Sequence, residues 1–303
     1  MTVDAVLIAG PTAGGKSRAA LALAGRICGA VVNTDSMQVY RDARILTGRP
    51  ADTELSHVPH LLYGHIDASD GYSAARFQRD AAAALAQTRA LGRVPIFTGG
   101  TGLYFEALTQ GLAEIPAISE GVRKELRARR ARLGESAFFA EFAARDPETA
   151  ARLLPSDTQR VLRAFEVIEG SGRPLAHWQT MRGIAPLAEA KLSRFVLSPP
   201  RPELHRRIES RFEQMMDSGA LEEAARLKGL DPRLPAAKIL GLRELWAVLD
   251  GTSSLEAAKI AAKAATRQYA KRQLTWFRQR MADWRWIESE DPDEIVAEML
   301  EQI

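Results

Sequence analysis

The residues best suited to chemistry lie at 10–17, where a Gly-x-x-x-x-Gly-Lys-Ser pattern directly follows the apolar run 5–9. Glycines let the backbone turn so that successive N–H groups converge on phosphate oxygens, while the lysine adds a point charge. The serine hydroxyl can hold Mg²⁺ in the first turn of the next helix. The pattern predicts a metal ligand at Ser17 and a phosphate-bearing ligand bound by Gly10, Pro11, Thr12, Ala13, Gly14, Gly15, Lys16 and Ser17.

Asp35 is the best-placed carboxylate near this loop, because it directly follows the short apolar strand expected at 30–33. In open α/β sheets, ligands bind outside the carboxyl ends of the strands, so we expect Asp35 beside the phosphate loop. A nucleotide hydrolase has an apolar strand that ends in a magnesium-binding Asp. Here the later strand at 93–98 ends in Thr-Gly-Gly. Asp35 therefore suits an ionised carboxylate that orients or deprotonates a nucleophile, with a plain turn cap as the alternative.

The elements that must position these residues follow an α/β pattern. Apolar strands and amphipathic helices alternate at 5–9, 16–27, 30–33, 73–91 and 93–98. This alternation predicts a parallel sheet flanked by helices, as in the P-loop NTPase-like fold. After the core resumes, further elements are expected at 193–198, 202–218, 236–249, 254–281, 284–287 and from 292.

Between these core segments the pattern changes to short amphipathic helices separated by breakers. We therefore predict a helical insertion domain at 114–190 and a catalytic core made of 1–113 and 191–303.

The composition excludes several classes of protein. Of the 303 residues, 46% are hydrophobic and 26% are charged, and no apolar run approaches the ~18 residues of a membrane span. The first residues lack a basic segment, so no secretory signal is indicated and a cytoplasmic location is expected. The single cysteine, Cys28, excludes an internal disulfide and a cysteine metal cluster, and we expect a buried structural thiol.

Basic residues are concentrated in two segments, although the net charge is only +3. Residues 122–133 carry six bases and one acid, and residues 257–282 carry seven bases and no acid. In the second segment Lys259, Lys263, Arg267 and Lys271 recur every four residues, which predicts a basic stripe on one helix face. Both segments could contact a polyanion, and interleaved aromatic residues could stack on bases or belong to the core.

Three motifs in order resemble the signatures of the tRNA dimethylallyltransferases, also called tRNA isopentenyltransferases. They are the loop at 10–17, Asp-Ser-Met-Gln-Val-Tyr at 35–40 and Gly-Gly-Thr-Gly-Leu-Tyr at 99–104. The resemblance continues through 157–164, 204–212 and 266–278, and so covers nearly the whole chain.

The resemblance implies transfer of a dimethylallyl group from dimethylallyl diphosphate to the N6 amine of the adenosine 3′ of the anticodon, in tRNAs that read codons beginning with U. The phosphate loop would then bind the diphosphate, with Mg²⁺ as cofactor. By resemblance Asp35 is the base, Arg211 reaches the diphosphate, and Ser17 positions metal or diphosphate.

The resemblance also implies contacts with the tRNA anticodon stem-loop, from both the core and the insertion, and favours a monomer without an obligate protein partner. The implied contact residues are Asp35, Ser36, Met37, Gln38, Thr101, Arg123, Gln159, Arg160, Val161, Leu162 and Arg163. To these the basic helix adds Lys271 and Arg272.

Three other functions remain as alternatives. An adenylate prenyltransferase of the cytokinin type would share the loop and the base but has little use for the basic helix. A small-molecule kinase would bind ATP at the same loop. A non-catalytic RNA-binding protein would not depend on Asp35.

Overall fold

The computed structural model describes residues 3–51, 53 and 58–303, which divide into two compact units. The first comprises Met1–Thr109 and Pro186–Ile303, and the second comprises Gln110–Ala185. Each unit has its own hydrophobic core.

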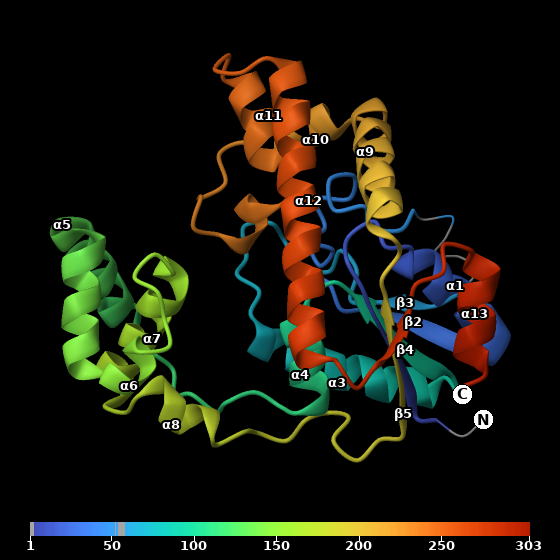
Figure 1. The fold of residues 1–303 in the computed structure, drawn as a ribbon, viewed down its shortest axis with the longest axis horizontal. Coiled ribbons are helices and arrows are strands. Elements are labelled where there is room, and N and C mark those ends of the chain that lie inside the picture. Colours follow the sequence, from blue (N-terminus) through green and yellow to red (C-terminus); the bar gives the residue numbers. More distant parts are fainter. Residues whose placement is uncertain (1–2, 52, 54–57) are drawn as a thin grey trace. The chain divides into compact units, whose positions relative to one another are not determined.

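The first unit is built on a parallel six-stranded sheet in the order β3-β2-β4-β1-β5-β6 (Figure 1). The strands are β1 (Ala5–Ala9), β2 (Gly29–Asn33), β3 (His60–Leu61), β4 (Val94–Gly99), β5 (Leu192–Leu197) and β6 (Arg285–Ile287). Every residue of β1 and β2 is buried, as expected for parallel strands covered on both faces. The predicted α/β fold, a parallel sheet flanked by helices, is confirmed.

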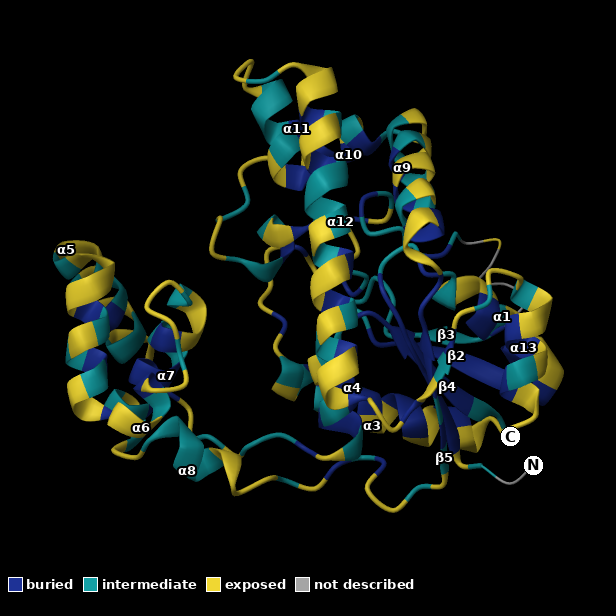
Figure 2. Cartoon of the chain, in the orientation of Figure 1, coloured by how far each residue is buried: buried dark blue, intermediate teal, exposed yellow. Residues whose placement is uncertain are grey.

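Helices cover this sheet and bury their apolar faces against it, seen as dark blue in Figure 2. Ile8, Leu23 and Phe195 lie at the centre of the main cluster. Among its described residues, the helices of this unit are α1 (Lys16–Ile27), α3 (Ala74–Ala90), α4 (Gly102–Thr109), α9 (Arg201–Asp217), α10 (Ala220–Arg226), α11 (Leu242–Leu249), α12 (Leu255–Arg280) and α13 (Pro292–Leu300).

Two expectations for this unit are wrong. The helix expected at 236–249 is a 3₁₀ turn, Pro235–Lys238, followed by α11, because Gly241 adopts a left-handed conformation (φ 84°) that starts a new helix. Cys28 is exposed, because it caps α1 in a left-handed turn (φ 51°) instead of continuing the buried face that ends at Ile27.

The second unit is helical, with α5 (Glu120–Arg145), α6 (Pro147–Ala150), α7 (Thr158–Ser171) and α8 (Leu175–Gln179). Phenylalanines from α5 and α7 form its core: the ring centroids of Phe138 and Phe165 are 5.3 Å apart, and those of Phe142 and Phe165 are 5.7 Å apart. Gly134 interrupts α5 with a φ of 75°. The unit can therefore present α5 and α7 as a packed pair.

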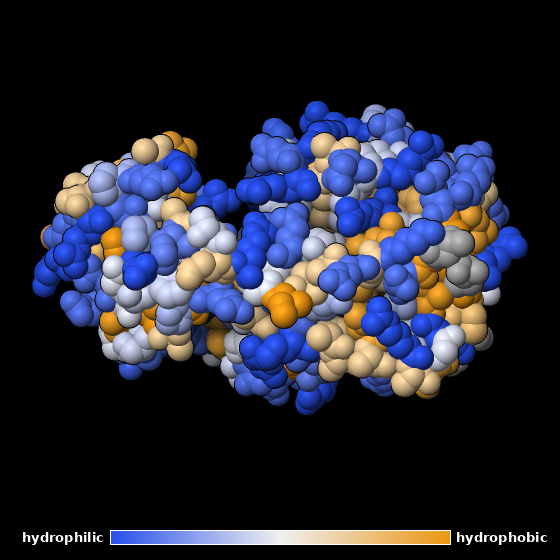
Figure 3. Space-filling model, turned by 90° about the horizontal axis from the view of Figure 1, so that it is seen from below, coloured by the Kyte–Doolittle hydropathy of each residue, from blue (hydrophilic) through white to orange (hydrophobic). Residues whose placement is uncertain are grey.

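Within the described part of the chain, no helix is both long and apolar enough to cross a membrane. The face drawn in Figure 3 carries hydrophilic residues interspersed with apolar ones on both units.

Candidate active site

Three loops meet at the carboxyl edge of the sheet, where β4 lies between β2 and β1. The loop after β2 is joined to β4 by the Thr34 N–H, which donates to the Thr98 carbonyl at 2.8 Å, and Thr34 O accepts from the Thr101 N–H at 3.2 Å. A Cβ at Gly99 would lie 2.1 Å from the Thr34 carbonyl. Only glycine permits this approach, so the Gly-Gly-Thr-Gly motif has a packing role.

The phosphate loop follows β1 and leads into α1 through Gly15, whose φ is 88°. The Lys16 Nζ donates to the Pro11 carbonyl at 2.6 Å, and the Gly14 N–H donates to the same oxygen at 3.0 Å. Ser17 is exposed in the first turn of α1. The loop thus ends at a helix N-terminus, where free N–H groups favour an anion.

The electrostatics of this edge also favour an anion. Burial lowers the pKa of Lys16 to about 8, against the opposing effect of Asp35 and with a smaller lowering by Arg211. Burial likewise lowers the pKa of Arg211, and Asp35 again opposes the shift. Two poorly hydrated cations therefore share one carboxylate, and an added anion would stabilise their charged forms.

Arg211 reaches this edge from α9, where its Nη2 donates to the Thr47 carbonyl at 3.3 Å. The Gln38 amide donates to the carbonyls of Thr47 and Gly48, each at 3.1 Å, so Gln38 holds this turn in place. The turn is further fixed by the buried carboxylate of Glu223, which accepts N–H bonds from Arg44, Ile45 and Leu46.

Arg207 lies one helical turn before Arg211 and approaches the phosphate loop. A Cβ at Gly15 would lie 3.4 Å from its Nη1. Its Nε donates to Glu203 Oε1 at 2.5 Å, and this bond contributes to the lowered pKa of Glu203, after the larger contribution of Arg206.

Asp35 is held at both its backbone and its side chain. Its N–H donates to Asn33 Oδ1, and its Oδ1 accepts from the Met37 N–H, both at 2.9 Å. The neighbouring Ser36 N–H donates to Thr101 Oγ1 at 2.9 Å, and this bond ties the loop after β2 to that after β4.

The remaining carboxylate oxygen of Asp35, Oδ2, would be 3.3 Å from a Cβ at Gly100. Two tyrosines lie within its electrostatic reach: burial raises the pKa of Tyr104 and of Tyr269, and Asp35 adds to both shifts. Asp35 is only half-buried, so a substrate can reach it.

Sequence reasoning assigned no role to Gln273, although it lies inside the motif at 266–278. Its side chain is 5% exposed and hydrogen bonds to the backbone of both the phosphate loop and the loop after β4. Its burial, which is unusual for a glutamine, appears only in the structure, since Gln268 and Gln279 lie on the same helix.

The described residues contain no cluster of three or more acidic, histidine or cysteine side chains able to hold a metal ion. The candidate donor for Mg²⁺ is the exposed hydroxyl of Ser17. This single donor fits Mg²⁺, because that ion commonly keeps several waters and binds through substrate phosphates.

The insertion residues expected to contact tRNA lie on two helices of the second unit: Arg123 on α5 and 159–163 on α7. Burial lowers the pKa of Arg163, Glu166 opposes this shift and Arg123 adds to it, so the two arginines lie close together. Gln159 and Arg160 are exposed and Leu162 is half-buried. Val161, in contrast, is 2% exposed and packs in the core of this unit.

The predicted basic stripe on α12 is largely neutralised. Lys259 and Lys263 both pair with Glu213, and Arg267 pairs with Glu209 at 3.1 Å. Three of the four bases in the expected stripe are therefore paired, because α9 supplies acids that the sequence window 257–282 does not contain.

Further along α12, Lys271 and Arg272 are exposed, and the Arg272 guanidinium lies 5.7 Å from the centroid of the Tyr269 ring. Phe277 is fully buried and belongs to the core, whereas Trp276 is half-buried and packs against Gly102.

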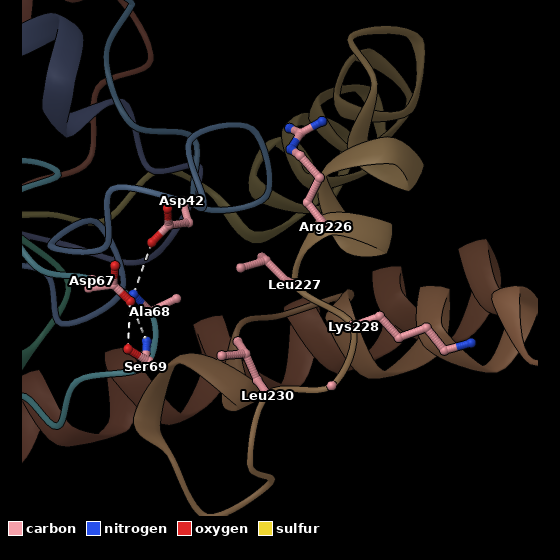
Figure 4. A pocket seen from close by; sticks show the side chains of 9 residues that line it. Asp42, Asp67, Ala68, Ser69, Arg226, Leu227, Lys228 and Leu230 are labelled. Carbon is pink, nitrogen blue, oxygen red and sulfur yellow. Dashed lines mark hydrogen bonds between the residues drawn. The ribbon is translucent and has the colours of Figure 1, made fainter.

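A cavity of about 390 Å³ lies between the loops after β2 and the chain that follows α10 (Figure 4). Asp42 accepts the Ala68 N–H at 2.9 Å, and Asp67 accepts the Ser69 hydroxyl at 2.7 Å, so both carboxylates hold the loop. None of the predicted site residues lines this cavity.

The chain is similar in sequence to proteins of one family. The family model described as IPP transferase matches residues 38–280. A tRNA dimethylallyltransferase of Rhodospirillum centenum is 52% identical over 93% of this chain and 90% of its own length. One of Rhizobium meliloti is 48% identical over 96% of each chain.

Solved structures are similar as well. The tRNA isopentenylpyrophosphate transferase of Bacillus halodurans is 34% identical, with a TM-score of 0.69 over 99% of this chain and 98% of that one. A eukaryotic dimethylallyltransferase acting on tRNA is 26% identical, with a TM-score of 0.79 over 94% of this chain and 73% of that one.

Proposed function

This chain belongs to the IPP transferase family, and from that membership we propose that it is a tRNA dimethylallyltransferase. It transfers the dimethylallyl group of dimethylallyl diphosphate to the N6 amine of the adenosine 3′ of the anticodon. The substrates are tRNAs that read codons beginning with U.

One observation supports this proposal most directly: a carboxylate and two partly buried cations lie within mutual electrostatic reach at one edge of the sheet. Lys16 and Arg211 supply the positive charge, and Asp35 influences both. A reaction that releases an anion on one side and a proton on the other needs this combination.

In the proposed reaction the adenosine N6 attacks C1 of the allylic group, the C–N bond forms and the C1–O bond to diphosphate breaks. The leaving diphosphate takes the electron pair of that bond. Lys16, Arg211 and N–H groups of the phosphate loop neutralise its growing charge. Asp35 accepts the proton that N6 loses.

Ser17 would hold Mg²⁺ together with the diphosphate oxygens. A bound Mg²⁺ would supply further charge neutralisation to the leaving group.

The tRNA contacts are proposed to come from both units. In the first, Ser36, Met37, Gln38 and Thr101 surround Asp35 in the bonded loops, with Lys271 and Arg272 exposed on α12. In the second, Arg123 and Arg163 lie close together, with Glu166 Oε2 3.8 Å from Arg163 Nη1, and we propose that this pair of arginines contacts a phosphate. We also propose a cytoplasmic location for the protein, where its tRNA substrates occur.

Transfer of a labelled dimethylallyl group to unmodified tRNA tests the proposal, with free AMP as a parallel acceptor and Mg²⁺ present or withheld. Label in tRNA alone supports it. Label in AMP would favour the adenylate prenyltransferase, and ATP-dependent phosphate transfer with no prenyl transfer would favour a kinase.

A further inference from the structure

The side-chain amide of Gln273 connects two loops of the active site. Its Oε1 accepts the Thr12 N–H at 2.9 Å, and its Nε2 donates to the Gly100 carbonyl at 2.8 Å. Thr12 belongs to the phosphate loop after β1, and Gly100 belongs to the loop after β4. With only 5% of the residue exposed, both bonds are shielded from water.

The contact requires an amide of this length and a glycine opposite it. A Cβ at Gly100 would lie 2.2 Å from Gln273 Nε2, and one at Gly102 would lie 2.2 Å from the Trp276 ring. The glycines at 100 and 102 therefore allow α12 to pack closely against this motif. A carboxylate at 273 could accept the Thr12 N–H but could not donate to Gly100, and a methionine could do neither.

The two loops carry opposite sides of the proposed reaction. Thr12 shares its loop with Lys16, which faces the diphosphate. Gly100 precedes Thr101, whose hydroxyl accepts the Ser36 N–H and so fixes the segment that holds Asp35. Gln273 thus links the leaving-group side to the base side.

We propose that Gln273 is a positioning residue that sets the phosphate loop relative to Asp35. This inference rests on the proposed function. In a displacement, the nucleophile and leaving group must lie on opposite sides of the reacting carbon, and a misplacement of ~1 Å costs about 100-fold in rate. Gln273 touches neither reacting atom and acts through the two backbones that it joins.

The two hydrogen bonds of Gln273 also affect which N–H groups of the phosphate loop can bind the ligand. Those of Thr12 and Gly14 are already donated within the protein, to Gln273 and Pro11 respectively. A diphosphate therefore takes its bonds from other N–H groups of the loop and from Lys16.

The first test compares Gln273→Met with Gln279→Met in the full-length protein. Gln279 is an exposed glutamine on the same helix, and so controls for the loss of one amide. We expect Gln273→Met to lower kcat for prenyl transfer by about 10- to 100-fold while tRNA affinity stays close to that of the control. Equal kcat values in the two variants would overturn the positioning role.

The second test uses Gln273→Glu and its pH profile, because protonation of the introduced carboxyl would restore both hydrogen bonds. A protonated carboxyl can accept from Thr12 and donate to Gly100, whereas the ionised form repels the Gly100 carbonyl. Burial should raise the pKa of the introduced carboxyl.

We therefore expect the activity ratio of Gln273→Glu to wild type to rise as the pH falls from about 8.5 to about 6, since this range covers a carboxyl pKa raised by burial. An activity ratio that does not change with pH would overturn the proposal that Gln273 positions the two loops. Wild-type protein that prenylates no tRNA would instead overturn the proposed function itself.

Discussion

A Cβ at Gly48 would lie 1.6 Å from Nη2 of Arg211, so the guanidinium occupies the space that any side chain at position 48 would need. Gly48 has a φ of +58°, a conformation that side chains with a Cβ rarely adopt. The turn that holds it is fixed by Glu223 and Gln38, and Arg211 donates to the Thr47 carbonyl there. The position of the arginine is therefore determined by the turn.

Gly48→Ala should displace Arg211 and raise the KM for dimethylallyl diphosphate by about tenfold or more, since a charge-assisted contact to the substrate weakens. Steady-state kinetics of prenyl transfer measure this effect. Gly92→Ala is the matched control, because Gly92 has a φ of +63° with nothing within 4 Å of its Cβ position. An equal KM in both variants would mean that Arg211 does not bind the diphosphate.

Asp35→Asn keeps the shape of the side chain and an oxygen that accepts the Met37 N–H, but it removes the carboxylate that could take up a proton. We expect transfer to fall by about 10²- to 10⁴-fold, the usual contribution of a positioned base. Filter binding should show tRNA affinity near that of the exposed-site control Asp70→Asn. Parallel loss of tRNA binding and transfer would refute the assignment of Asp35 as the base.

The lowered pKa of Lys16 predicts a pH-dependent affinity for dimethylallyl diphosphate. In the free protein this pKa is about 8. A bound anion raises it, so binding favours the protonated lysine. Affinity should be constant below about pH 8 and fall above it by up to about tenfold per pH unit, as linkage requires. Calorimetric titration from about pH 7 to 9.5 spans both regimes on either side of that pKa.

Lys16→Met provides the control for this titration. The affinity of this variant for dimethylallyl diphosphate should be lower at every pH. It should stay constant above about pH 8, where the affinity of the wild type falls. A wild-type affinity that stays unchanged across the same range would show that Lys16 does not supply the pH dependence.

The ion pairs on α12 predict which cations bind tRNA. Lys271→Ala with Arg272→Ala should weaken binding by about tenfold and lower the slope of log affinity against log salt by about 1 to 2, as expected for lost phosphate contacts. Lys259→Gln with Lys263→Gln should have a much smaller effect, because these lysines already pair with Glu213 and, for Lys259, also with Glu256. Equal effects of the two double variants would show that the paired lysines bind tRNA as strongly as Lys271 and Arg272 do.

Local sequence patterns were sufficient for much of the fold. The apolar run before the phosphate loop is β1, and the helix expected at 16–27 is α1 with the same bounds. These elements depend on periodicity and on loop residues that are neighbours in the chain. The prediction of one helix at 236–249 was wrong, because helix propensity alone does not show that Gly241 adopts a left-handed backbone conformation.

The sequence by itself determined the chemistry available to this protein: a phosphate loop, a carboxylate after β2, an arginine on α9 and a basic α12. Tertiary structure decided how these groups are used. Glu213 on α9 pairs with lysines that look available in the sequence. Gly48 leaves room for the Arg211 guanidinium, and Gln273 joins two loops from a distant helix. Such pairings form between residues far apart in the chain, so they depend on how the helices pack and not on local patterns.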